Sequence, residues 1–246
     1  MAKTIIGDKI MEKINVTGIN ISNVTLDEAV ESVINFAKQD NPSIVVTPNA
    51  EFAKNAIDNR DFMDLLNKAD LVIPDGAGII LAAKILGKPL KGKVAGVDLA
   101  AALLPQIEKE GLSLFLFGSE PGVAEKAAEN IKKKYPSIKI AGTLNGFFKD
   151  DSDVVPIIRN SNADVLFVCL GSPKQEYFMF NNKDKLNVKV MLGLGGSINI
   201  FAGVAKRAPE FFIKYHLEWF YRLIKEPSRI GRMMKLPLYI WDTFLI

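Results

Sequence analysis

The alternation of short apolar runs with helical patterns is the feature that most constrains the fold of this chain. Runs rich in Val, Ile, Leu and Phe, bounded by Gly, Pro, Asn or Asp, have the length of buried strands. They lie at residues 13–19, 43–47, 71–73, 113–117, 139–142, 165–170 and 189–192. Helical spacing of apolar residues occurs between them, at residues 98–110, 121–134, 153–160 and 173–181. This alternation predicts an α/β fold, with a Rossmann-like, mostly parallel sheet and helices on both faces.

Local signals add detail to this prediction. Thr25 and Glu28 have the spacing of a capping box, which predicts that a helix begins between them. A chain of 246 residues is long for one domain and short for two, so we expect one main core with an appendage. Hydrophobic residues make up 48% of the chain and charged residues 24%, which excludes a disordered chain.

The rare residue types limit the chemistry and the compartment. The one cysteine, Cys169, lies in an apolar run and cannot form a disulfide within the chain, which indicates a reducing, cytoplasmic compartment. The one histidine, His216, excludes a metal site built from several histidines. No stretch reaches the roughly 20 apolar residues that span a bilayer. Charged residues interrupt the first ten residues, so we expect no secretory signal there, and Met11 offers a second start.

The C-terminal part of the chain differs in charge from the rest. Residues 206–246 contain eight Lys or Arg and four Asp or Glu, a net charge of +4; because the whole chain carries +3, residues 1–205 sum to −1. Both tryptophans lie in the same segment. This composition predicts a surface that meets anionic lipid or phosphate, and the alternative is a helical hairpin docked on the core. We therefore divide the chain into an α/β core, residues 11–205, and a C-terminal helical appendage, residues 206–246.

Small and polar residues follow the predicted strands. Ligands of open α/β sheets bind outside the carboxyl ends of the strands, and the segments there read TPNAEF, PDGAG, GSEPG, GSPKQE and GLGGSINIFAG. Glycines let backbone N–H groups approach phosphate oxygens, so these segments suit a phosphate-bearing ligand. The dinucleotide fingerprint is incomplete, because Ile198 stands where its third glycine would fall, and no P-loop motif occurs. We expect no nucleic-acid partner.

Two groups of aspartates have alternative interpretations. Asp151 and Asp153 have the spacing of a metal-binding Asp-x-Asp motif, but they precede a helix, where acidic caps are expected. We therefore predict no metal site. Asp75 lies between Pro74 and Gly76, where it is either a catalytic carboxylate or the cap of the helix that begins at Gly76. From the residues alone, both interpretations of Asp75 remain open.

The order of the motifs is more specific than any one of them. TPNAEF, PDGAGI, FLFGSEPG, LFVCLGSPKQE and GLGGSINIFAGVAKRAPEFF resemble, in this order, the WecG/TagA/CpsF family of glycosyltransferases, from about residue 13 to residue 232. The chain is most similar to the branch that acts in wall teichoic acid synthesis. The resemblance implies transfer of N-acetylmannosamine from UDP-N-acetylmannosamine to the C4 hydroxyl of lipid-linked N-acetylglucosamine diphosphate. It also implies inversion at the sugar carbon and no metal or other cofactor.

The resemblance assigns roles to residues of the core. It implies that Asp75 is the general base, with Thr47 and Asn49 in the same pocket. Four residues after the last strand would face the nucleotide: Gly195, Gly196, Ser197 and Asn199. Asn199 stands where an aspartate is common in the family, and either side chain can bond a ribose hydroxyl.

Two further residues are candidates for the substrate. Gln175 is a candidate sugar or phosphate contact, or else a residue of the helix surface. Arg207 suits a bidentate contact to the UDP phosphates.

The resemblance also gives the appendage a function. It implies that the appendage brings the enzyme to the inner face of the membrane and completes the site with Arg222, Arg229 and Arg232. Several alternatives remain: another UDP-sugar donor, a nucleotide-dependent oxidoreductase, or a non-catalytic adaptor at the membrane surface. Exposed apolar helices also allow a homo-oligomer. Residues 1–10 have no counterpart in the family.

Overall fold

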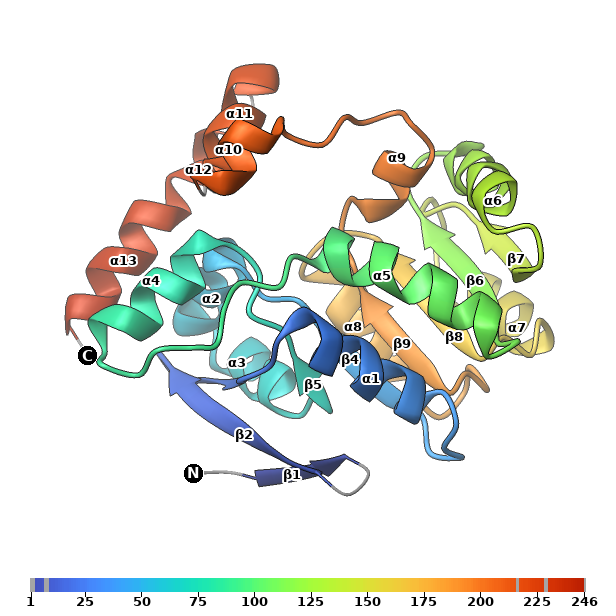
Figure 1. Cartoon of the computed structure of the whole chain (residues 1–246), viewed down its shortest axis with the longest axis horizontal. Coiled ribbons are helices and arrows are strands. Elements are labelled where there is room, and N and C mark those ends of the chain that lie inside the picture. Colours follow the sequence, from blue (N-terminus) through green and yellow to red (C-terminus); the bar gives the residue numbers. More distant parts are fainter. Residues whose placement is uncertain (1–2, 7–8, 216, 228–229, 246) are drawn as a thin grey trace.

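A parallel sheet forms the centre of the molecule (Figure 1). The computed structural model describes residues 3–6, 9–215, 217–227 and 230–245, and of residues 3–6, 9, 10 and 222 it describes only the backbone. The sheet has six strands in the order β5-β4-β9-β8-β6-β7, and every neighbouring pair is parallel. The strands are β4 (Ser43–Val46), β5 (Leu71–Val72), β6 (Ser113–Gly118), β7 (Lys139–Leu144), β8 (Val165–Cys169) and β9 (Val190–Gly193). The predicted Rossmann-like sheet is confirmed.

Helices cover both faces of this sheet, as predicted (Figure 1). One apolar cluster packs under α1 (Leu26–Phe36), α5 (Gly96–Lys109), α6 (Val123–Lys134) and α9 (Ser197–Phe201). The other packs under α2 (Ala50–Asp58), α3 (Arg60–Asn67), α4 (Ala77–Ile85), α7 (Asp151–Asn160) and α8 (Lys174–Asn182). Successive side chains of a strand alternate between the faces; in β4, Val45 belongs to the first cluster and Ile44 and Val46 to the second.

The prediction of one strand at residues 13–19 is wrong. The chain instead forms a separate antiparallel sheet from β1 (Lys3–Ile6), β2 (Lys9–Val16) and β3 (Ile19–Ser22). Thr17 and Gly18 connect β2 to β3 with φ angles of 51° and 95°. A two-residue hairpin turn with both φ angles positive matches the twist of its strands. Threonine is an uncommon residue at such a position, which is why the apolar run resembled one strand.

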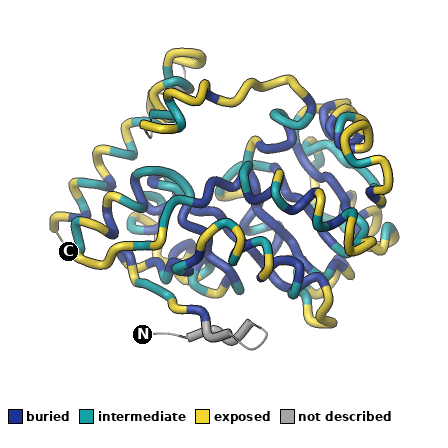
Figure 2. The backbone as a smooth tube through the Cα atoms, in the orientation of Figure 1, coloured by how far each residue is buried: buried dark blue, intermediate teal, exposed yellow. Residues whose placement is uncertain are grey.

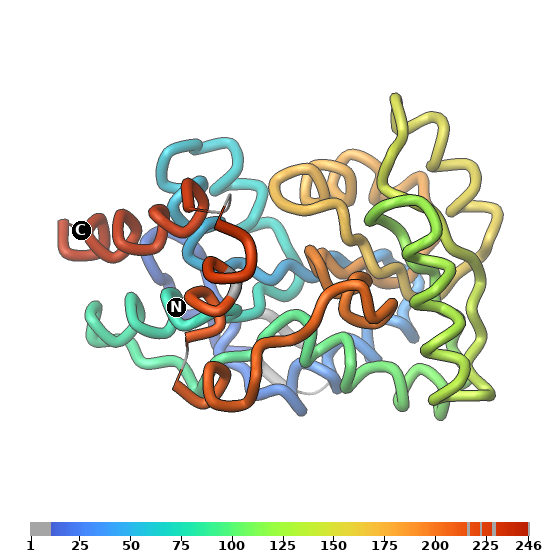
Figure 3. The backbone as a smooth tube through the Cα atoms, turned by 90° about the horizontal axis from the view of Figure 1, so that it is seen from above, coloured from blue at the N-terminus to red at the C-terminus, as the bar shows by residue number. Residues whose placement is uncertain are grey.

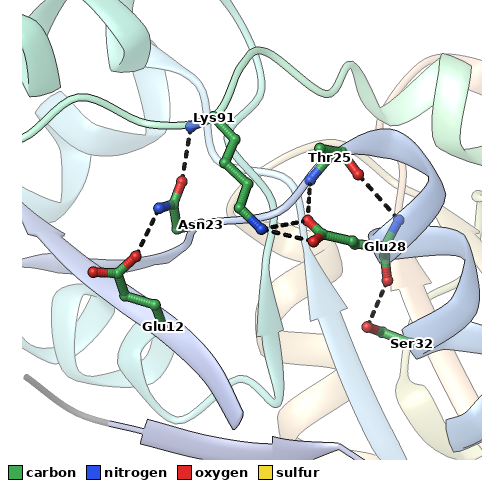
Figure 4. A network of polar contacts seen from close by, with 6 residues as sticks. All are labelled: Glu12, Asn23, Thr25, Glu28, Ser32 and Lys91. Carbon is green, nitrogen blue, oxygen red and sulfur yellow. Dashed lines mark hydrogen bonds and ion pairs between the residues drawn. The ribbon is translucent and has the colours of Figure 1, made fainter. Parts of the chain in front are cut away.

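A polar network anchors the segment that connects α4 to α5 (Figure 4). The predicted capping box is present: the Thr25 hydroxyl accepts from Glu28 N, and Glu28 Oε2 accepts from Thr25 N at 2.8 Å. Glu28 Oε1 also lies 2.6 Å from Lys91 Nζ, and the hydrogen bond from Lys91 lowers the pKa of Glu28. Lys91 N donates to Asn23 Oδ1 at 2.8 Å, and the Asn23 amide donates to Glu12. These contacts hold the connection against the start of α1.

The C-terminal appendage is partly docked and partly exposed. It consists of α10 (Glu210–Lys214), α11 (Glu218–Lys225), α12 (Ile230–Met233) and α13 (Lys235–Leu245). Helix α13 packs against α2 and α4 (Figure 3), and its Tyr239 is fully buried with its hydroxyl 3.1 Å from Thr17 Oγ1. The described residues of α10 to α12 are mostly exposed (Figure 2). In the described part of the chain, no helix is both long and apolar enough to cross a membrane.

Gly118, at the end of β6, gives a stability prediction. Gly118 ends β6 with φ +130°, and a Cβ atom there would lie 2.3 Å from the carbonyl oxygen of Cys169 on β8. We expect Gly118→Ala to lower the free energy of unfolding by about 3 kcal/mol, because both the backbone conformation and the contact oppose a side chain.

Urea titration measures this difference. Gly92→Ala is the control, since nothing lies within 4 Å of a Cβ at Gly92 and its φ is not in the left-handed region. We expect the control to stay within about 0.5 kcal/mol of the wild type. Equal unfolding midpoints for the two variants would contradict the prediction.

Candidate functional site at the carboxyl ends of the central strands

The connections after β4 and β9 leave the sheet toward opposite faces. The chain continues from β4 into α2, which packs on one face, and from β9 into α9, which packs on the other. Adjacent strands with this arrangement form the topological switch point at which α/β proteins bind ligands. Thr47 joins the two strand ends, because its hydroxyl donates to the carbonyl of Gly193 at 2.8 Å and is buried.

Thr47 and Asn49 position the starts of two helices. Asn49 Oδ1 accepts from the backbone N–H groups of Glu51 at 2.9 Å and Phe52 at 3.2 Å, and therefore caps α2. The start of α5 lies against Thr47: a Cβ atom at Gly96 would be 3.2 Å from Thr47 Oγ1. Both side chains thus lie at the switch point, and each has a structural contact there.

Asp75 does not cap α4. The N-cap of α4 is Gly76, which has no side chain with which to bond the helix end. Asp75 Oδ2 instead accepts from Gly96 N at 3.2 Å, at the first residue of α5. Its own N–H is 3.2 Å from the Pro48 carbonyl, which ties β5 to the segment after β4. The half-buried carboxylate therefore lies at a helix N-terminus, where the helix dipole stabilises negative charge.

The buried side chain of Gln175 bonds the glycine-rich loop after β9. The side chain of Gln175 is fully buried, so its interpretation as a helix-surface residue is wrong. Gln175 Oε1 accepts from Gly195 N at 3.0 Å, and its Nε2 donates to Glu176 Oε1 at 2.7 Å. Gly193 makes room for this contact, since a Cβ there would lie 2.9 Å from Gln175 Nε2. The amide of Gln175 therefore fixes the position of the loop.

The remaining residues of the loop differ in exposure. Ser197 is buried and donates to the Leu194 carbonyl at 2.7 Å, whereas Gly196 is exposed. Asn199 Oδ1 accepts from the hydroxyl of Ser119, which follows β6. The loop thus presents Gly196 and the half-buried Asn199 at the switch point, while Ser197 stabilises the turn.

Glu176 is the site residue that the sequence did not reveal. Its side chain is fully buried, with the amide of Gln175 and the hydroxyl of Ser172 beside it. Burial raises the pKa of Glu176 to about 7, and the hydrogen bond from Gln175 partly opposes this shift. The residue is part of the GSPKQE segment, but two adjacent buried polar residues on one helix do not follow from helical spacing.

Two of the four candidate arginines have described side-chain contacts near this edge. Arg207 forms a paired contact with Asp98 in the first turn of α5, at 2.5 and 2.7 Å. Arg232 Nε lies 3.8 Å from Glu51 in the first turn of α2. The structure therefore brings both guanidinium groups to helices that start at the switch point. The side chain of Arg222 on α11 is not described, and Arg229 and His216 lie outside the described residues.

The acidic run forms the cap of α7, but the N-cap is Asp150; Asp153 completes a capping box and Asp151 is the first helical residue. Asp150 accepts from Ser152 N at 2.8 Å, and Asp153 accepts from Asp150 N at 3.3 Å. Asp151 accepts from the Asn182 amide at 2.6 Å. Each acid of the run thus has a structural contact, and the described side chains include no group of three or more His, Cys, Asp or Glu arranged to hold a metal.

This arrangement defines a class of protein. A parallel sheet with a carboxylate, an amide and a glycine-rich loop at its switch point, and with arginines near two helix N-termini, is typical of enzymes that bind nucleotide-linked substrates. The chain belongs to the WecG/TagA/CpsF family of glycosyl transferases, whose sequence model matches residues 14–245.

Relatives with the name of one enzyme cover most of the chain. It is 38% identical over 205 residues to an N-acetylglucosaminyldiphosphoundecaprenol N-acetyl-beta-D-mannosaminyltransferase of Bacillus spizizenii. This alignment covers 83% of this chain and 80% of that protein. The protein of the same name from Bacillus subtilis is 38% identical over 197 residues, 80% of this chain and 77% of its own. That from Staphylococcus aureus is 32% identical over 231 residues, 93% and 91% of the two chains.

The buried Glu176 predicts a pH dependence of stability. Its pKa is about 7 in the folded protein and about 4.5 for an exposed glutamate, so the folded state holds the proton more tightly. The stability that this proton contributes is complete below pH 4.5 and is lost as the pH rises through 7. Glu176→Gln is neutral at every pH and removes this dependence.

We expect the wild type to lose about 3 kcal/mol more unfolding free energy than Glu176→Gln between pH 4.5 and pH 8. Urea titration at several pH values measures the two slopes. Glu129→Gln, an exposed glutamate on α6, is the matched control and should keep the wild-type slope. Equal slopes for Glu176→Gln and the wild type would show that the buried carboxyl does not titrate in this range.

Proposed function

We propose that this chain transfers N-acetylmannosamine from UDP-N-acetylmannosamine to the C4 hydroxyl of undecaprenyl-diphosphate-linked N-acetylglucosamine, with inversion. This reaction builds the linkage unit of wall teichoic acid. One observation carries the proposal. Thr47, Asn49 and Asp75 lie together at the switch point, and 83% of this chain aligns, at 38% identity, with the N-acetylmannosaminyltransferase of Bacillus spizizenii.

Asp75 is the proposed general base. In an inverting transfer, a carboxylate takes the proton of the acceptor hydroxyl while that oxygen attacks the anomeric carbon, and UDP leaves from the opposite face with the electrons of the broken bond. The hydrogen bond from Gly96 N orients one carboxylate oxygen. Thr47 and Asn49 position the starts of the neighbouring helices, and so fix the surroundings of this carboxylate.

Protein groups offset the charge of the departing UDP. Arg207 uses part of its guanidinium for Asp98, and because the group carries five N–H donors, others remain for phosphate oxygens. The exposed Gly196 and the loop around it offer backbone N–H groups, and the loop is braced by Gln175. Asn199 is the proposed contact to the ribose, and we propose that no metal takes part.

The appendage is proposed to act at the inner face of the cell membrane. It carries the excess of positive charge, and the exposed aromatic side chains of Phe211, Tyr215 and Trp241 are of the kind that binds at a lipid interface. The acceptor is a lipid, so the reaction takes place at such an interface. Arg232, near the start of α2, is the proposed link between the appendage and the acceptor diphosphate.

The direct test is release of UDP from UDP-N-acetylmannosamine in the presence of a short-chain acceptor. A different UDP-sugar that supports faster release would change the donor and leave the reaction class intact. Binding of UDP without turnover of any donor would favour the non-catalytic adaptor. Reduction of NAD without UDP release would favour the oxidoreductase.

Asp75→Asn tests the base. We expect turnover to fall by about 10² to 10⁴, because general-base catalysis contributes that much to the rate, while UDP affinity and melting temperature stay close to those of the wild type. Steady-state kinetics, UDP titration and thermal unfolding measure the three quantities. Asp64→Asn, a half-exposed acid on α3, is the control and should retain full activity. Near-normal turnover of Asp75→Asn would show that Asp75 is not the general base.

Arg232→Lys separates a site contact from attraction to the bilayer. A lysine keeps the charge but loses the planar fork of donors that matches phosphate oxygens. With a soluble acceptor, we expect kcat/KM to fall about tenfold if Arg232 grips the diphosphate. Arg60→Lys, an exposed arginine on α3, is the control. Unchanged kinetics of Arg232→Lys on the soluble acceptor would leave Arg232 a role in membrane attachment alone.

A further inference from the structure

An apolar groove of about 830 Å³ runs between α4 and the appendage. We name it the appendage groove; α4, α11, α12 and α13 form its walls, which include Ile80, Leu81, Trp219, Ile230, Trp241 and Phe244. Among the described residues that line it, Lys84 is the one that carries a charge. Its volume is in the range of sites that bind small organic molecules.

The lining selects the chemistry of the occupant. A peptide segment carries backbone N–H and C=O groups, and a sugar carries hydroxyls, which need hydrogen-bond partners when buried. The described lining of the appendage groove offers few polar side-chain atoms as hydrogen-bond partners. A hydrocarbon chain needs no such partner. Leu81, Trp241 and Phe244 are 47%, 65% and 67% exposed, so much of their apolar surface is available to a ligand. The lining therefore fits a hydrocarbon.

The groove begins beside the proposed base. Ala77 and Gly78, the first residues of α4, line one end of it, and Asp75 precedes Ala77 by two residues. Gly78 lets α13 close onto α4, since a Cβ there would lie 2.7 Å from Leu236 Cδ1. From this end α4 extends for nine residues, about 13 Å. A lipid whose sugar lies at Asp75 can thus lay its chain along α4.

We propose that the appendage groove binds the first prenyl units of the acceptor, next to its diphosphate. This inference rests on the proposed function, because the acceptor there is a polyprenyl diphosphate sugar. The groove makes the hydrocarbon a recognised part of the substrate and not only its anchor. The affinity for the acceptor then depends on the length of the chain, even in the absence of a bilayer.

Tryptophan fluorescence tests occupancy without activity. The two tryptophans of the protein, Trp219 and Trp241, both line the groove. Farnesyl diphosphate in detergent-free solution should shift their emission to the blue; geranyl diphosphate should bind more weakly, and inorganic diphosphate should give no shift. Leu81→Ser should weaken farnesyl diphosphate binding about tenfold, because a leucine loses its apolar contact. Ile157→Ser is the matched control, since Ile157 on α7 is 49% exposed and lies outside the groove.

Kinetics with acceptors of different chain length provide the second test. Leu81→Ser should raise KM about tenfold for a farnesyl-linked acceptor, and leave KM for the UDP-sugar and for a methyl-linked acceptor unchanged. Normal turnover with no effect of chain length or of Leu81→Ser would contradict prenyl binding in the groove, and the proposed function would stand. The expected fluorescence response without UDP release from any donor would support the groove and contradict the proposed function.

Other occupants give different results. If a second copy of the chain fills the groove, emission changes with protein concentration in the absence of ligand. If the groove meets the bilayer surface itself, phosphatidylglycerol vesicles without prenyl lipid shift the emission and farnesyl diphosphate does not. Either result would overturn the proposal.

Discussion

The parallel pairing of β4 with β9 is the constraint on which the rest of the structure depends. Their register pairs Val46 with Gly193 and brings the two strand ends to the same level, where the Thr47 hydroxyl bonds the Gly193 carbonyl. Because α2 and α9 leave from this point toward opposite faces, their starts diverge and leave space between them. The pairing of β5 with the other edge of β4 then brings Asp75 beside Thr47. A shift of one residue in this register would turn every side chain of β4 to the opposite face and dissolve the site.

Much of this arrangement follows from the sequence, because it rests on local signals. Apolar runs bounded by glycine or proline predict the parallel strands, and the strand-end rule then brings Thr47, Asn49 and Asp75 together. The hydrogen bond between Gly96 N and Asp75 does not follow from the sequence. Gly76 is the N-cap of the nearest helix, yet the carboxylate bonds Gly96, at the start of a helix that the chain reaches only after α4 and a long connection. Such a contact depends on the packing of α5 and on the network that holds the connection at Lys91.

Burial of Gln175 and Glu176 shows a second limit of sequence patterns. Helical spacing predicts which residues share a face, but two adjacent residues are both buried only when the helix is covered on two sides. Helix α8 meets this condition, since it packs against β4, β8 and β9 and also against α3. Burying a carboxyl group costs free energy that an apolar residue would avoid. Glu176 accepts a hydrogen bond from the amide of Gln175 and orients it, and the amide oxygen then accepts from Gly195 N. The free-energy cost of burying Glu176 therefore accompanies a contact that fixes the loop.

In the proposed reaction, the appendage connects the core to the lipid substrate. Its last helix is fixed: Tyr239 is buried at Thr17, Leu236 packs on Gly78, and Lys54 bonds Asp242 at 2.8 Å. Removal of the whole appendage would therefore expose the core surface of α2 and α4 as well as remove arginines, and loss of activity on truncation would not separate the two effects. Single substitutions at the exposed helices avoid this problem. Because α2 and α4 both begin at the switch point, the surface that holds α13 is built from the same helices that position Asn49 and follow Asp75. If the appendage meets a membrane as proposed, that contact is connected to the site through the packing of α13 on these two helices.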